Sequence, residues 1–135
     1  MRAEAFLDTG IFIAWLVKGD RHHAEAEDLL ATPPRSLATS IAVASETYAW
    51  FLHRFGEHEA RIFRLALREL PGLTLLPVDL PHHGAVERKL ERLRGQKLTY
   101  VDASSLVFLA QHRIKLVWGT DLHLGIEGAR VLPGS

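Results

Sequence analysis

The stretch Ala5-Phe6-Leu7-Asp8-Thr9-Gly10 decides how the fold begins. Its leading apolar residues predict a short strand over 5–7, and the apolar residues that follow Gly10 predict a helix over 10–17. Asp8 stands directly at the end of the strand. A carboxylate beside a core segment rarely lacks a partner, because burying an unpaired charge is costly. Asp8 is therefore expected either to cap the helix that follows or to bind a cation.

The same alternation of short strands and helices runs through the rest of the chain. The remaining strands are predicted at 36–38, 73–78, 115–118 and 129–132, and the remaining helices at 21–30, 41–55, 57–70, 81–93 and 99–111. Asp20, and either Thr39 or Ser40, are expected to cap two of these helices, and Pro33-Pro34 is expected to form a loop. Because no repeat or long linker divides the chain, we expect one domain over 1–135. Its predicted class is α/β, a three-layer sandwich with a central, mainly parallel sheet.

The composition limits the class of protein. A hydrophobic fraction of 47% in 135 residues is enough for the core of one domain. The 16 basic and 16 acidic residues balance, so any RNA contact must come from local clusters or from a bound cation. The absence of cysteine excludes disulfides, thiolate nucleophiles and cysteine zinc sites. It is compatible with the cytoplasm, and no apolar run reaches membrane-spanning length, so we expect a cytoplasmic protein without a membrane segment.

Four acidic residues stand beside apolar elements: Asp8, Glu46, Asp102 and Asp121. Asp8 and Asp121 follow predicted strands, and the carboxyl ends of parallel strands form the edge of a sheet where ligands bind. Glu46 and Asp102 lie in the first or second turn of predicted helices. They reach the same edge if those helices begin there. The sequence therefore predicts that the fold gathers all four acids.

Each acid also has a simpler structural role to weigh against this prediction. Asp8 can cap the helix that follows it. Asp102 lies three residues after Thr99, as in a capping box, and Asp121 can stabilise a turn. Glu46 is harder to explain in this way, because its neighbours at helical spacing are apolar.

A divalent cation would remove the repulsion among the gathered acids. Two carboxylates about 5 Å apart repel by roughly 3 kcal/mol at an effective dielectric of about 20. Hard oxygen ligands, without cysteine or clustered histidine, favour Mg²⁺ or Mn²⁺ over zinc. Such an ion can generate hydroxide and stabilise the leaving oxygen of a phosphodiester. The four acids therefore predict metal-dependent hydrolysis of phosphodiesters.

Four motifs, in a fixed order, carry a family resemblance. They are Phe6-Leu7-Asp8-Thr9-Gly10-Ile11-Phe12, Ser45-Glu46, Leu98-Thr99-Tyr100-Val101-Asp102-Ala103 and Gly119-Thr120-Asp121-Leu122-His123-Leu124. With them the chain resembles the PIN-domain family over essentially its whole length, and within that family the VapC-type toxins of toxin–antitoxin pairs. Two positions depart from the family pattern: Gly10 stands where serine or asparagine is often found, and Leu124 where an aromatic residue is common.

The resemblance implies a Mg²⁺- or Mn²⁺-dependent endoribonuclease. The family's acidic ligands correspond to Asp8, Glu46, Asp102 and Asp121, and its supporting hydroxyls to Thr9 and Thr120. Among the acids, those matching Asp8 and Asp102 are the expected direct metal ligands. The resemblance also implies a homodimer and, for a toxin, a cognate antitoxin protein that blocks the site.

Basic and aromatic residues offer further candidate contacts with RNA. A basic cluster is formed by Arg88, Lys89, Arg92, Arg94 and Lys97. It predicts either a phosphate-binding rim, with Lys97 best placed, or a solvated helix face paired with Glu87 and Glu91. His123, two residues after Asp121, is either a surface residue or a group that contacts the substrate or moves a proton. The aromatic residues of 48–51 serve either helix packing or base stacking.

Two rival functions remain to be tested. A PIN fold that holds RNA or a partner protein without cutting it would need no metal, and the presence of all four acids argues against it. A DNA nuclease of the related flap type is disfavoured, because the chain is short and lacks the insertions that thread DNA. PIN domains also act in RNA processing without an antitoxin, so the toxin role is a separate prediction from the ribonuclease activity.

Overall fold

The computed structural model describes residues 2–32 and 36–135, so the loop predicted at Pro33-Pro34 lies outside the described residues. Within them the chain forms five strands, six α-helices and one short 3-10 helix. In chain order the elements are β1 (Ala5–Leu7), α1 (Thr9–Leu16), α2 (His23–Ala31), β2 (Leu37–Ser40), α3 (Ile41–Phe55), α4 (Glu57–Glu69), β3 (Leu73–Leu76), α5 (Leu80–Arg92), α6 (Tyr100–His112), β4 (Leu116–Gly119), the 3-10 helix η1 (Leu122–Gly125) and β5 (Arg130–Pro133).

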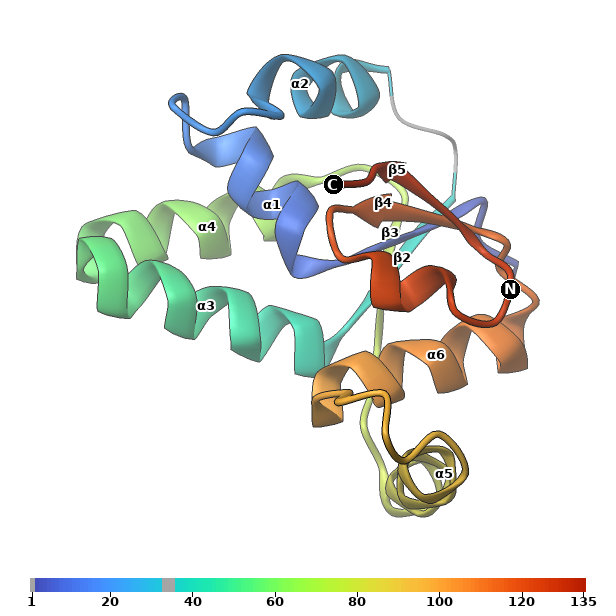
Figure 1. The fold of residues 1–135 in the computed structure, drawn as a ribbon. Helices are drawn as coiled ribbons and strands as arrows, with labels where there is room; N and C mark the ends of the chain where they lie inside the picture. The colour runs from blue at the N-terminus through green and yellow to red at the C-terminus, as the bar shows by residue number, and fades with distance from the viewer. Residues whose placement is uncertain (1, 33–35) are drawn as a thin grey trace.

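The strands form one sheet in the order β3-β2-β1-β4-β5, and every neighbouring pair is parallel. The predicted mainly parallel sheet is therefore confirmed. In Figure 1, α1 and α2 lie on one side of the sheet and α5 and α6 on the other, which gives the predicted three layers. The helix pair α3 and α4 lies at the left of the same view. Since all strands run the same way, their carboxyl ends meet at a single edge.

The central strand β1 is enclosed on both faces. Ala5, Phe6 and Leu7 have no exposed surface, as expected for a strand of a parallel sheet covered by helices on both sides. On one face, the Phe6 ring stacks against Phe108 of α6, with ring centroids 6.5 Å apart. This packing holds the end of β1, and with it Asp8, in a fixed position.

Local sequence signals place most helix starts correctly. Ser40 caps α3, accepting a hydrogen bond from the Val43 backbone N–H at 3.1 Å. Thr99 and Asp102 form the predicted capping box at the start of α6. Asp79 caps α5 by accepting from the His82 N–H at 2.9 Å. These caps set where α3 and α6 begin, which decides the position of the acids in their first turns.

Three details differ from the predictions. The expectation that Asp20 caps the second helix is wrong: its side chain accepts from the His22 N–H in a preceding turn, and α2 begins at His23. The strand predicted over 73–78 ends at Leu76, because Pro77 has no N–H to donate to a ladder. The 3-10 helix η1 was not predicted. Within the described ranges, no helix combines the length and apolar character that crossing a membrane requires.

Candidate active site

The carboxyl edge of the sheet brings the acidic residues together. Asp8 directly follows β1, and Asp121 lies two residues after β4. Glu46 is in the second turn of α3, which begins where β2 ends, and Asp102 is in the first turn of α6. Because α6 leads back to β4, its first turn lies at the carboxyl edge and its last turn at the amino edge. The topology therefore places all four acidic residues at the carboxyl edge of the sheet, as predicted.

Asp8 is the most buried acid of this group, with 5% of its surface exposed. Its pKa is raised to about 7, chiefly by burial; the Thr9 backbone N–H opposes the rise, and the charges of Glu46, Asp121 and Asp102 add to it. Asp8 occupies the residue before α1, yet its side chain makes no capping hydrogen bond to that helix. The Asp8 carboxylate therefore does not cap α1.

Glu46 is held by a chain of hydroxyl groups. The Thr9 hydroxyl donates to Glu46 Oε1 at 2.5 Å. The Thr47 hydroxyl in turn lies 3.1 Å from the Thr9 oxygen and 2.8 Å from the Val43 carbonyl oxygen of its own helix. Thr9 therefore orients the Glu46 carboxylate, and its supporting role in a metal site remains a prediction. Thr47 was not among the predicted residues, since nothing in the sequence marks a threonine one position after Glu46 as part of a site.

Asp102 forms the capping box that the sequence predicted, and its carboxylate also lies beside another acid. Its Oδ2 accepts from the Thr99 backbone N–H at 3.0 Å, and the Thr99 hydroxyl accepts from the Asp102 N–H at 3.1 Å. Burial raises the pKa of Asp102; the Thr99 N–H lowers it, and the neighbouring Asp121 raises it. One carboxylate oxygen thus closes the helix cap, while the group as a whole lies against another acid.

Asp121 and His123 complete the group. Asp121 Oδ1 accepts from the His123 backbone N–H at 2.9 Å, which caps η1, and it lies 3.1 Å from the imidazole Nδ1. Ligand atoms of Asp102, Asp121 and His123 all lie within 4.8 Å of one another. His123 was predicted only as an RNA contact or proton carrier, and this arrangement adds it to the residues that could hold an ion.

The donor set fits a hard divalent cation. Asp8 and Asp102 are buried carboxylates with raised pKa values, and among the described residues neither forms an ion pair with lysine or arginine. Carboxylates destabilised by one another and left without a protein cation are a site at which a metal ion would relieve the repulsion. The oxygen-rich set is of the kind that Mg²⁺ and Mn²⁺ prefer, with one imidazole at its rim.

Two glycines let the segments of this edge approach closely. A Cβ at Gly119 would lie 3.0 Å from Asp8 Cβ. A Cβ at Gly10 would lie 2.2 Å from Thr120 Oγ1 and 2.9 Å from its backbone nitrogen. The departure from the family pattern at Gly10 is therefore matched by close packing of α1 on the loop that carries Asp121. No carboxylate partner of the Thr120 hydroxyl is found in the described part of the chain, so the supporting role of Thr120 remains a prediction.

We expect Gly10→Ala to destabilise the protein by about 1–3 kcal/mol, the typical cost of overpacking. The methyl group would meet the backbone of Thr120, which cannot move aside as a flexible side chain can. Urea denaturation would measure the loss. Gly19→Ala is the matched control, because a Cβ at Gly19 meets no atom within 4 Å. Equal stability of the two variants would contradict the close approach.

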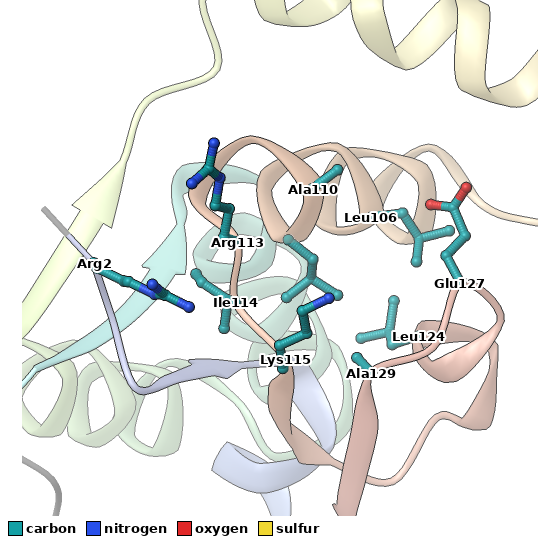
Figure 2. A pocket seen from close by; sticks show the side chains of 10 residues that line it. Arg2, Leu106, Ala110, Arg113, Ile114, Lys115, Leu124, Glu127 and Ala129 are labelled. Carbon is teal, nitrogen blue, oxygen red and sulfur yellow. The ribbon is translucent and has the colours of Figure 1, made fainter.

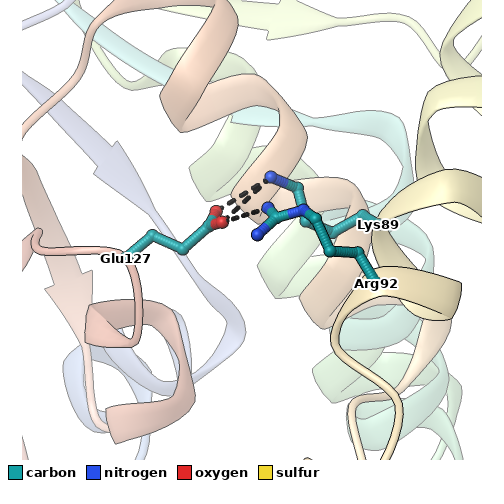
Figure 3. A network of polar contacts seen from close by, with 3 residues as sticks. All are labelled: Lys89, Arg92 and Glu127. Atoms are coloured by element: carbon teal, nitrogen blue, oxygen red, sulfur yellow. Dashed lines mark hydrogen bonds and ion pairs between the residues drawn. The ribbon is translucent and has the colours of Figure 1, made fainter.

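The basic cluster is partly committed to a long-range ion pair (Figure 3). Lys89 Nζ donates to Glu127 Oε1 at 2.9 Å, and the Arg92 guanidinium donates to Oε2. The expected local pairing holds for Arg94, which lies 3.0 Å from Glu91 Oε2. Lys89 and Arg92 therefore join α5 to the loop before β5, which leaves them less suited to binding phosphate. Lys97 is exposed in the loop before α6, and its contact with RNA remains a prediction.

We expect Glu127→Gln to lower the free energy of unfolding by about 0.5–1 kcal/mol at pH 7, as is typical of partly exposed pairs. Burial opposes ionisation of Glu127, but Arg92 and Lys89 outweigh it and lower its pKa. A lowered pKa means that the stabilisation exists above the unfolded-state value of 4.5 and is lost as the pH falls through the folded-state value. Denaturation of both proteins at pH 7 and pH 3 would test this, since the difference should become smaller at the lower pH.

A cavity of about 360 Å³ lies at the amino edge of the sheet, away from the acids (Figure 2). Three basic residues lie around it: Arg2 precedes β1, Arg113 follows α6, and Lys115 precedes β4. Leu106 and Leu124 are among the apolar residues that line it. None of the four gathered acids lines this cavity. The candidate active site is therefore the acidic carboxyl edge, and these amino-edge cations lie apart from it.

Comparisons with known proteins agree with this geometry. The sequence model of the PIN domain family matches residues 5–124. Among solved structures, Mycobacterium tuberculosis VapC20, a sarcin–ricin loop cleaving toxin, is 24% identical with a TM-score of 0.84, over 93% of this chain and 96% of that one. A toxin–antitoxin complex from Klebsiella pneumoniae is 22% identical with a TM-score of 0.64, over 95% of each chain. FitAcB from Neisseria gonorrhoeae is 16% identical with a TM-score of 0.66, over 94% and 95%. None of the curated protein sequences compared with this chain matches it.

The fold and the site define an α/β protein whose parallel sheet gathers acidic side chains at its carboxyl edge. The family match, which covers most of the chain, goes further: the chain belongs to the PIN domain family. Its fold is the one seen in solved VapC-type toxin structures. The resemblance drawn from the four sequence motifs is thus confirmed at the level of family and fold.

Proposed function

We propose that this chain is a Mg²⁺- or Mn²⁺-dependent endoribonuclease that hydrolyses RNA phosphodiester bonds. The observation that carries the proposal is Asp8: a buried carboxylate whose pKa is raised to about 7, next to three further acids. Such an arrangement costs stability, and it is expected where a site is built for a cation. Membership of the PIN family supports the same conclusion.

We assign the roles within the site as follows. Asp8 and Asp102 bind the metal directly, and Asp121 and Glu46 complete or orient the shell of ligands. Thr9 holds the Glu46 carboxylate in place through its short hydrogen bond. When bound, a divalent cation activates water and neutralises the charge that develops on the phosphate.

Residues at the rim are proposed to contact the RNA. The His123 side chain is 46% exposed, so it can reach a substrate while keeping its contact with Asp121. Lys97 precedes the α6 turn that carries Asp102, and its exposed ammonium group is suited to a neighbouring phosphate. Both assignments continue the sequence-based predictions.

The toxin role is a second, separable part of the proposal. Similar structures include toxins and toxin–antitoxin complexes, which supports a cognate antitoxin protein as partner. A homodimer and a cytoplasmic location belong to the same proposal, because they accompany this role in the family that the chain resembles. The rival function, a PIN fold that binds without cutting, is distinguished by the experiment below.

The test is cleavage of total cellular RNA by the purified protein with Mn²⁺ or Mg²⁺, against a matched EDTA control. We expect cleavage with either metal and none in EDTA. Cleavage that continues in EDTA would contradict the metal-dependent mechanism. If no cleavage occurs, titration calorimetry with Mn²⁺ decides further: absence of metal binding would replace the proposal with the non-cleaving module.

A further inference from the structure

A groove of about 620 Å³ extends from the acidic edge along α3. It is lined by Thr9, Glu46, Ala49, Trp50, His53 and Arg54. Glu46, Trp50 and His53 follow one another at spacings of four and three residues, so they lie on one face of the helix. A proposed catalytic acid, an aromatic ring and two basic side chains thus follow in that order along one continuous surface.

Trp50 is held in a defined position within this groove. Its ring meets Phe51 at 85° with centroids 5.1 Å apart, and Phe55 at 71° with centroids 5.7 Å apart. Neither phenyl ring therefore lies parallel to the indole. The Arg54 guanidinium carbon lies 5.3 Å from the indole centroid. The indole is thus oriented by its neighbours, and an exposed arginine lies over its face.

We propose that this groove is a nucleobase subsite for single-stranded RNA, in which a base stacks on Trp50 and Arg54 and His53 bind the adjoining phosphate. The inference rests on the proposed ribonuclease function and names the substrate form that it takes. Stacking on an aromatic ring accepts any base, whereas the paired bases of a duplex expose no such face. The subsite therefore selects unpaired nucleotides beside the cleaved bond.

Spacing along the helix agrees with this assignment. Four residues of α-helix span about 6 Å, so Trp50 lies about one nucleotide step from Glu46 and Arg54 about two steps from it. In the described residues neither His53 nor Arg54 forms an ion pair with an acid. The positive charge of Arg54 thus remains available to offset the acidic edge, which on its own would repel RNA.

The charge and position of the groove favour RNA over an apolar partner helix. A purely apolar groove would suit a helix, but this one places a guanidinium over its aromatic ring and a second basic residue beside it. The end of the groove nearest the acidic group is formed by Thr9 and Glu46, which belong to the site proposed to act on phosphodiesters. A nucleotide, which carries both a phosphate and a planar ring, matches both ends of this groove.

The kinetic test compares cleavage of an unstructured RNA oligonucleotide by wild type, Trp50→Ala and Trp50→Phe. We expect Trp50→Ala to lower kcat/KM roughly 5- to 150-fold, mainly through KM, and Trp50→Phe to restore most of the loss, because phenylalanine keeps a stacking face. Arg54→Gln should also raise KM. Its matched control is Arg2→Gln, which removes the same charge at the amino edge and should leave KM unchanged.

A binding test in EDTA with the Asp102→Asn variant is independent of catalysis. The oligonucleotide should quench indole fluorescence, and the additional change Trp50→Phe should remove most of this quenching while circular dichroism stays the same. This result would support the subsite whether or not the wild type cleaves, so failure of the ribonuclease proposal remains distinguishable. An unchanged KM in Trp50→Ala and Arg54→Gln, or quenching that persists without Trp50, would overturn the subsite and leave the groove to a second copy or a partner protein.

Discussion

Replacement of Asp102 by asparagine is expected to lower the rate of RNA cleavage on the order of 10³-fold, the scale of removing one strong electrostatic contribution to a transition state. Asparagine has nearly the same shape but no negative charge. Its side-chain oxygen can still accept the Thr99 N–H, so the cap of α6 is retained. Since burial and Asp121 raise the pKa of Asp102, removing its charge should not destabilise the metal-free protein. Single-turnover cleavage with saturating Mn²⁺, together with thermal melting in EDTA, would measure both effects.

Asp79→Asn is the matched control for this experiment. Asp79 also caps a helix, through its hydrogen bond from the His82 N–H at 2.9 Å, but it lies outside the acidic group. The same chemical change should therefore leave the cleavage rate within about twofold of wild type, because no charge at the site is altered. Equal rates for the two variants would show that the cap of α6, and not the Asp102 charge, is what the sequence motif preserves.

The position of the acids was predictable because it follows from local signals and from topology. Asp8 and Asp121 each follow a short apolar strand, and a parallel sheet brings such positions to one edge. Thr99 and Asp102 form a motif that closes on itself within four residues. Each inference required only neighbouring residues and the knowledge that the strands run the same way.

The contacts that refine the site were not predictable in the same way. Gly10 approaches Thr120 across more than 100 residues, and this closeness depends on how helix α1 packs against the loop that follows β4. The basic residues Lys89 and Arg92 are interleaved in the sequence with Glu87 and Glu91, yet the structure pairs them with Glu127, over 30 residues away. Periodicity predicts which face of a helix a side chain shares, but not which of several partners the tertiary fold offers.

The second large effect is expected for Asp8, on stability. The pKa of this carboxyl is 3.8 in the unfolded chain and about 7 in the folded protein. Between these pH values the folded state keeps a proton that the unfolded state has lost, so the free energy of unfolding falls as the pH rises. The difference in pKa corresponds to a loss of about 4 kcal/mol at pH 8, relative to pH 3.

Asp8→Asn should remove this loss. In EDTA at pH 8 we expect the variant to exceed wild type in free energy of unfolding by about 2–4 kcal/mol, and at pH 3 by close to zero, since the wild-type carboxyl is then largely protonated in both states. Urea denaturation across this pH range would measure the difference. Asp28→Asn on the exposed face of α2 is the control, expected within about 0.5 kcal/mol of wild type throughout.

Metal binding should make wild type more stable than Asp8→Asn, the reverse of the order expected in EDTA. A cation that binds the folded state stabilises it in proportion to the logarithm of its concentration over Kd, so saturating Mn²⁺ at pH 8 should stabilise wild type and act much less on Asp8→Asn. The raised pKa and the metal affinity then have one cause: the Asp8 carboxylate is buried, and no lysine or arginine of the described residues pairs with it. If Asp8→Asn were less stable than wild type in EDTA at pH 8, the Asp8 carboxylate would be a stabilising part of the fold, and the case for a site built around a cation would fail.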